Sequence, residues 1–146
     1  MTTESTQTIR FNVPLPPVWI RSNSRSHWAR RVRAKQEYSQ TVLMYAVDAE
    51  PAWPAAVLNQ RWARARVTFT WRACKLPDQA NVLPNCKALL DILCTAPKTT
   101  QRNDTTYLGI IEDDKGVEAI GRVEKVAHRA DEGVLVTIER VEDGSA

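Results

Sequence analysis

Apolar and polar residues alternate along several stretches of the chain, and this pattern predicts β-strands. The strongest alternation runs from Arg64 to Ala73. Its apolar positions are Ala65, Val67, Phe69 and Trp71. An earlier strand is expected at Ile9–Leu15, which two prolines end. Two more strands are expected at Glu118–Ala127 and Val134–Val141, and the short polar segment between them predicts a hairpin.

Two other stretches repeat apolar residues at the spacing of a helix. The first, Ser26–Asp48, predicts a long amphipathic helix whose basic residues lie mainly in its first half. Its apolar positions are Trp28, Val32, Tyr38, Val42, Tyr45 and Ala46. The second helix is expected to begin near Pro84, because proline suits a first helical turn. Its apolar stripe consists of Cys86, Leu89, Leu90 and Leu93.

Strands and helices therefore follow one another along the chain without an internal repeat, and this order predicts an α+β fold. With 146 residues, the chain is expected to form a single domain, built as a mixed β-sheet with two main helices. Residues 1–8 are expected to be flexible, and residues 95–106 are expected to form a long polar loop.

The composition indicates in which cellular compartment the protein works. Hydrophobic residues make up 43% of the chain and charged residues 25%, which is ordinary for a soluble globular protein. No run reaches the roughly 18 apolar residues of a membrane span, and the N-terminus lacks the apolar stretch of a signal peptide. The cysteines Cys74, Cys86 and Cys94 form no CxxC pair, which argues against a disulfide framework or structural zinc. We therefore expect a cytoplasmic protein without a membrane partner.

Positive charge is concentrated in one segment, although the net charge is only +3. Residues 21–35 contain no acidic residue, whereas the tail at 131–143 is acidic. The basic residues of the segment are Arg21, Arg25, Arg30, Arg31, Arg33 and Lys35. A basic segment that also holds Trp28 favours contact with a nucleic-acid backbone. A solvated helix face is the alternative interpretation of this cluster.

Carboxylates lie at or near the ends of several predicted elements. Asp78 follows a strand, Asp91 lies in the second helix, and Asp113–Asp114 precede another strand. In a compact domain these positions can converge at one edge of the sheet, where their hard oxygen ligands would suit Mg²⁺, with Mn²⁺ as a substitute. Lys87, one helical turn before Asp91, would supply positive charge to a reacting phosphate. The alternative is that the aspartates cap helices and that Lys87 and Asp91 form a surface pair.

Several motifs follow one another in a recognisable order. They are "PLPP" after the first strand, "RSNSRSHW" before the basic helix, D-x-x-N at Asp78–Asn81, "KALLDIL" at Lys87–Leu93, and "IIEDD". Over most of its length, the chain resembles the RusA-type Holliday-junction resolvases of phages and prophages. The resemblance implies a RusA-like homodimer that binds four-way junctions and other branched DNA in the cytoplasm of a bacterial host. It also implies that the protein nicks two strands symmetrically with Mg²⁺ held by aspartates.

The same resemblance assigns roles to individual residues. Asp78 matches the first aspartate of the family's D-x-D-N motif, and Asn81 matches its asparagine, which is expected to contact DNA. Lys87 matches the essential lysine and Asp91 the helix aspartate. Asp113–Asp114 match an acidic pair, of which the second residue is the expected metal ligand. The catalytic set implied in this way is Lys87, Asp78, Asp91 and Asp114, with Asp113 as a further ligand for the metal.

One position departs from the pattern of the family. The second aspartate of D-x-D-N falls on Ala80, which offers no ligand oxygen. If the chain is extended here, positions 78 and 80 point to the same side, so an aspartate at position 80 would join Asp78 at the metal. Three functions stay open: an active junction endonuclease, a junction-binding protein with little or no cleavage, and a non-catalytic module that binds RNA or protein.

Overall fold

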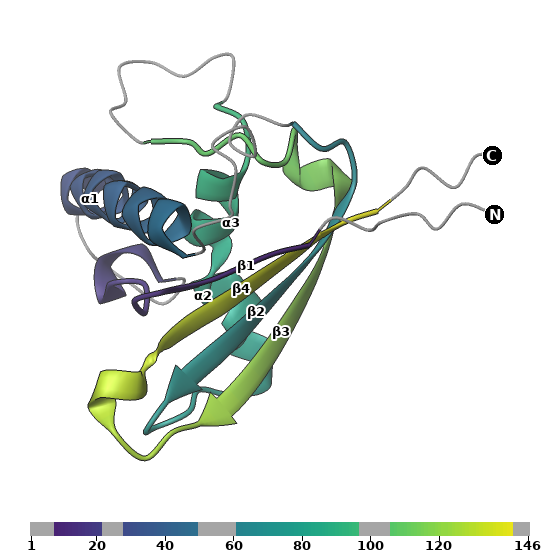
Figure 1. Ribbon diagram of the computed structural model, residues 1–146. Coiled ribbons are helices and arrows are strands. Elements are labelled where there is room, and N and C mark those ends of the chain that lie inside the picture. The colour runs from purple at the N-terminus through teal and green to yellow at the C-terminus, as the bar shows by residue number, and fades with distance from the viewer. Residues whose placement is uncertain (1–7, 22–27, 50–60, 97–105, 142–146) are drawn as a thin grey trace, which may run out of the picture.

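The computed structural model describes residues 8–21, 28–49, 61–96 and 106–141 (Figure 1). These residues form one α+β domain with a mixed sheet of four strands, as the sequence predicts. The expected flexible segment 1–8 lies outside the described residues except for Thr8, which begins the first strand. Most of the expected polar loop at 95–106, namely residues 97–105, also lies outside them.

The sheet consists of β1 (Thr8–Val13), β2 (Ala65–Ala73), β3 (Val117–Lys125) and β4 (Gly133–Arg140). Their order across the sheet is β1-β4-β2-β3. β4 is antiparallel to both β1 and β2, whereas β2 and β3 run parallel. A parallel pair needs a crossover connection, which the helical segment between β2 and β3 supplies. The start of β3 therefore lies beside the start of β2.

The predicted hairpin between the last two strands is wrong, because β2 lies between them. The connecting residues pass around the end of β2 instead of making a tight turn. The backbone N–H of Val126 donates to the carbonyl of Ala73 (3.1 Å), and the backbone N–H of Cys74 donates to the carboxylate of Glu132 (2.8 Å). Every second side chain of β2 is buried, as expected for a strand of a sheet that is covered on one face.

One face of the sheet is buried against helices. Alternate positions of neighbouring strands meet on it, for example Phe11 opposite Val136, which in turn lies opposite Phe69. Burying one such side chain contributes roughly 1.5–3 kcal/mol to folding. The helices are α1 (Trp28–Asp48), α2 (Val82–Asn85) and α3 (Lys87–Leu93), and all three gather on one side of the sheet in Figure 1.

α1 matches the predicted long helix over its described part, but its core-facing residues differ from the predicted stripe. The buried residues are Ala34, Tyr38, Ser39, Val42 and Ala46. The hydroxyl of Tyr38 donates to the carbonyl of Pro14 (2.6 Å) and fixes this face against the end of β1. Trp28, Val32 and Tyr45 are 71%, 40% and 48% exposed, so the stripe was wrong at these positions. Among the described helices, none is both long and apolar enough to cross a membrane.

The second predicted helix is divided in two at Cys86. The φ of −100° and ψ of 9° at this residue depart from helical values, and its N–H group is shared between the carbonyls of Val82 (3.0 Å) and Leu83 (3.1 Å). α2 lies close to the sheet because Gly121 faces it, and a Cβ atom at Gly121 would lie 3.0 Å from the Cβ atom of Val82. The chain leaves the bend at Lys87, the first residue of α3.

Candidate active site

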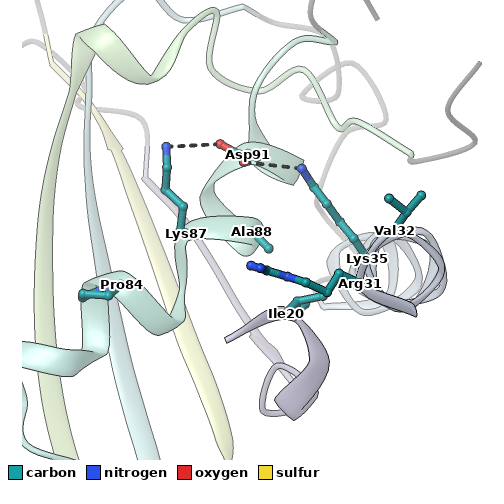
Figure 2. A pocket seen from close by; sticks show the side chains of 8 residues that line it. All are labelled: Ile20, Arg31, Val32, Lys35, Pro84, Lys87, Ala88 and Asp91. Atoms are coloured by element: carbon teal, nitrogen blue, oxygen red, sulfur yellow. Dashed lines mark hydrogen bonds and ion pairs between the residues drawn. The ribbon is translucent and has the colours of Figure 1, made fainter. Parts of the chain in front are cut away.

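Lys87 lies between two carboxylates that come from different parts of the chain. Its Nζ atom is 3.6 Å from Oδ1 of Asp91 and 3.3 Å from Oδ2 of Asp114. Figure 2 shows Lys87 and Asp91 pointing toward each other. The charge of Asp91, followed by the hydrogen bond with Asp114, raises the pKa of Lys87, so the amine is protonated at neutral pH. The structure thus brings together three of the residues that the sequence selected.

α3 fixes two of these three side chains. Lys87 and Asp91 are four positions apart, so they project from the same face of the helix. The opposite face is anchored in the core by the buried residues Ala88, Leu89, Ile92 and Leu93. The surface pair between Lys87 and Asp91 is therefore present as expected, and the apolar face of a short helix holds it in place.

The third side chain is brought in by the segment that precedes β3. The backbone N–H groups of Ile110 and Ile111 donate to the carbonyl of Leu93 (3.0 and 3.2 Å), which ties this segment to the end of α3. Asp114 then begins the 3₁₀ turn Asp114–Gly116, which leads into β3. This connection places Asp114 beside Lys87, which lies 27 residues earlier in the chain.

Asp113 has a structural role in the same turn. Its carboxylate accepts the backbone N–H of Lys115 (3.1 Å), so the capping interpretation is confirmed for this residue. This backbone hydrogen bond and a side-chain hydrogen bond with Asp114 lower the pKa of Asp113. Asp113 is therefore charged at neutral pH, close to the carboxylate that pairs with Lys87.

A cavity of about 710 Å³ lies beside this cluster, and we call it the acidic cavity. Its carboxylates are Asp91, Glu112, Asp113 and Asp114. Cys94 also lines the cavity. Burial, and then the nearby Asp114 and Asp91, raise the pKa of this thiol to about 12, so the thiol is protonated at neutral pH. Carboxylate oxygens are the groups of this cavity that suit a cation.

Lys35 connects α1 to the same cluster. Its Nζ atom is 3.4 Å from Oδ2 of Asp91 and 5.9 Å from the centre of the Tyr107 ring. On the other side of this ion pair lies a second cavity, of about 500 Å³, which we call the basic cavity. Lys35 and Asp91 line both cavities. Lys35, which the sequence placed on a DNA-binding surface, therefore reaches into the cluster of aspartates.

Other arginines of the basic segment differ in their surroundings. Arg31 lines the basic cavity, and Figure 2 shows its side chain extending from α1 toward Ala88. Arg30 and Arg33 are exposed residues of α1. Arg25 lies outside the described residues. Three of the expected DNA contacts, those of residues 30, 31 and 33, thus lie on accessible parts of one helix.

Arg21 does not belong with these surface cations. Its Nε atom donates to the carbonyl of Pro16 (2.7 Å), and its guanidinium lies 5.1 Å from the centre of the Trp71 ring. Burial lowers the pKa of Arg21, which marks an environment with reduced access to water. The guanidinium holds the loop after β1 against β2, and a contact of Arg21 with DNA stays a prediction.

Asp78 lies apart from the other aspartates. It precedes the 3₁₀ turn Gln79–Asn81, is exposed, and makes no capping hydrogen bond with its side chain, so the capping interpretation is wrong for this residue. Ala80 lies within the turn, so the chain is not extended, and the same-side relation expected for positions 78 and 80 does not hold. None of Asp78, Ala80 and Asn81 lines the acidic or the basic cavity. Their roles in metal and DNA binding stay predictions.

The acidic cavity suits Mg²⁺ in the chemistry of its donors, because carboxylate oxygens are the ligands that this ion prefers. Within the described part of the chain, no three carboxylate, imidazole or thiol groups are placed to hold one ion together. Asp91 and Asp114 are instead paired with lysines. Both carboxylates lie within 3.6 Å of the Nζ atom of Lys87 and are therefore close to each other, so they would be the residues to hold an ion that is completed by water ligands and that displaces the lysine.

Arg61 and Tyr107 are among the residues of the acidic cavity that were not selected from the sequence. Arg61 has a φ of 55° and donates its backbone N–H to the carbonyl of Gly109 (2.9 Å), which places it at the cavity. Tyr107, which interacts with Lys35, begins the apolar run "YLGII". Neither residue belongs to a motif, so only the fold identifies them.

Comparisons with models of protein families, with curated proteins and with solved structures found no match to this chain.

Proposed function

We propose that the protein is a Mg²⁺-dependent, structure-selective endonuclease that nicks branched DNA, four-way junctions in particular, as RusA-type resolvases do. The observation that carries this proposal is the position of Lys87 between Asp91 and Asp114, where an acidic and a basic cavity adjoin. A pair of carboxylates with a protonated lysine suits phosphodiester hydrolysis. The neighbouring cations of α1 suit a phosphate backbone.

In this proposal the residues of the chain bind and orient the scissile phosphate. Mg²⁺, or Mn²⁺ in its place, supplies a Lewis acid and an activated water molecule when bound. Asp91 and Asp114 hold the ion, and Lys87 faces the negative charge that develops on the phosphate. Arg31 and Lys35 hold the adjoining backbone through phosphate contacts.

We propose that the protein works as a homodimer in the cytoplasm. Symmetric nicking of a two-fold junction requires two active sites related by two-fold symmetry, and closed dimers are the commonest oligomers. The described part of one chain contains one cluster of Lys87, Asp91 and Asp114, so the second nick requires a second chain.

A junction-binding protein with weak or absent cleavage is the second candidate. The placement of Asp78 and Ala80 favours it, because the acidic cavity then lacks carboxylates that the resemblance to resolvases implies. The cations of α1 would still bind phosphates under this alternative.

One synthetic four-way junction, labelled on each strand in turn, separates these candidates. Paired nicks with Mg²⁺, together with binding in EDTA, support the endonuclease. Binding in EDTA without nicks in Mg²⁺ or Mn²⁺ supports the second candidate. If the protein neither binds nor nicks the junction, both are refuted, and a module that binds RNA or protein is left.

A further inference from the structure

The basic cavity combines apolar walls with a cationic rim. It lies between α1 and the bend that joins α2 to α3, and its volume of about 500 Å³ is within the range of roughly 300–1,000 Å³ found for small-ligand pockets. Its apolar walls are formed by Ile20, Val32, Pro84 and Ala88. The size and the lining suit a flat, mostly apolar group of a ligand that also carries negative charge.

Three cations surround this apolar space. Arg31, Lys35 and Lys87 line it; Figure 2 shows Arg31 extending from α1 toward Ala88, whereas Lys35 of α1 and Lys87 of α3 point toward Asp91. Asp91 lines the cavity as well, but Lys35 and Lys87 pair with its carboxylate at 3.4 and 3.6 Å. The net charge of these four side chains is positive, so the cavity favours an anion.

An exposed tryptophan lies on the same face of α1. Positions 28, 31, 32 and 35 are three or four residues apart, so Trp28 stands one helical turn before the residues of α1 that line the cavity. Its indole is 71% exposed, although tryptophan usually gains from burial. An exposed aromatic ring beside cations is the arrangement on which unpaired bases stack in proteins that bind single-stranded nucleic acid.

We propose that the basic cavity binds an unpaired nucleotide of the DNA substrate. Its base lies against the apolar walls and the indole of Trp28, and its phosphate lies among Arg31, Lys35 and Lys87. Lys35 and Asp91 line both cavities. The DNA strand therefore continues from this nucleotide into the acidic cavity. The inference rests on the proposed function and makes it more specific: the preferred branch has a base free of its partner beside the nick.

Binding in EDTA tests this inference without any need for cleavage. The probes are two fluorescent DNA duplexes that are identical except at one bulged position, which carries either thymine or an abasic residue. We expect the protein to bind the thymine bulge roughly tenfold more tightly by fluorescence anisotropy, because stacking favours the complex only when a base is present. Equal affinity for the two duplexes overturns the inference.

Two valines of α1 provide a matched pair of variants. Val32→Trp fills the basic cavity. It should reduce the preference for the thymine duplex to below about twofold and leave the affinity for the abasic duplex unchanged. Val47→Trp makes the same change at an exposed site about 22 Å further along the helix, and it should keep the preference of the wild type. If Val32→Trp keeps the preference, the inference is overturned.

Trp28→Ala is a second variant, chosen in case Val32→Trp does not fold. The indole is exposed, so its loss should leave the circular dichroism spectrum unchanged and reduce the preference for thymine. A full preference in Trp28→Ala contradicts the stacking role. If the protein nicks the junction but binds the thymine and abasic duplexes equally, the inference is overturned and the proposed function stands. Failure to bind either duplex or the junction overturns it together with the proposed function.

Discussion

The Nζ atom of Lys35 in α1 lies 3.4 Å from Oδ2 of Asp91 in α3, although 56 residues separate them in the chain. Lys87 pairs with the other oxygen of the same carboxylate, Oδ1, at 3.6 Å. A metal ion bound by Asp91 would have to compete with both ammonium groups for these oxygens. The helix that we expect to contact DNA is thus tied to a carboxylate that we expect to hold the metal.

This competition predicts that Lys35→Met binds Mg²⁺ more tightly in the absence of DNA. The expected gain is roughly threefold, because a partly exposed ion pair contributes less than about 1 kcal/mol. Competition with Mn²⁺, followed by electron paramagnetic resonance, measures it. Lys125→Met, an exposed lysine at the end of β3, is the control and should bind the ion as the wild type does. Weaker binding by Lys35→Met would mean that Lys35 orients Asp91 instead of competing with the ion.

Arg21 and Arg33 should respond in opposite ways to the same substitution. Arg21→Met removes the hydrogen bond to Pro16 and the contact with Trp71, so we expect it to lower the free energy of unfolding by about 1–2 kcal/mol. Arg33 is exposed, so Arg33→Met should change the free energy of unfolding by less than about 0.5 kcal/mol. The same substitution should weaken binding to the junction. Urea unfolding and anisotropy at fixed salt measure these quantities. An unchanged stability of Arg21→Met would contradict its structural role.

The elements that could be predicted from the sequence are those with a local signal. The alternation in β2 and the helical spacing in α1 arise within each element, and so does the pairing of Lys87 with Asp91 one turn apart. The parallel pairing of β3 with β2 depends on the crossover between them, which no local pattern encodes. The contact of Lys35 with Asp91 likewise requires that α1 and α3 be packed together first.

The family motif was a weaker guide at the turn that contains Ala80. The D-x-D spacing predicts that an aspartate at position 80 joins Asp78 at the metal, whereas the 3₁₀ turn places neither residue at the acidic cavity. We therefore expect Ala80→Asp to leave Mg²⁺-dependent junction cleavage within about threefold of the wild-type rate, a change of less than about 1 kcal/mol in the barrier. Single-turnover nicking measures it. A tenfold acceleration would show that position 80 reaches the metal.

The ion pairs of Lys87 predict a particular dependence of stability on pH. The raised pKa means that the folded protein holds this proton more tightly than the unfolded chain, whose usual value is 10.5. The stabilisation is therefore complete below about pH 10.5 and is lost as the pH rises through the higher folded value. The difference in unfolding free energy between wild type and Lys87→Met should be constant from pH 7 to about pH 10 and shrink above it. If this difference in unfolding free energy grows above pH 10, the ion pairs of Lys87 do not stabilise the folded protein as proposed.

The central claim is that Lys87, between Asp91 and Asp114, acts on the scissile phosphate, and single-turnover nicking of a four-way junction in Mg²⁺ tests it most directly. We predict that Lys87→Ala nicks at least about 100-fold more slowly than the wild type, since it lacks charge that faces the transition state. Its binding to the junction in EDTA should stay within about twofold, and Lys125→Ala should match the wild type in both respects. A Lys87→Ala protein that folds and nicks at the wild-type rate would contradict the claim.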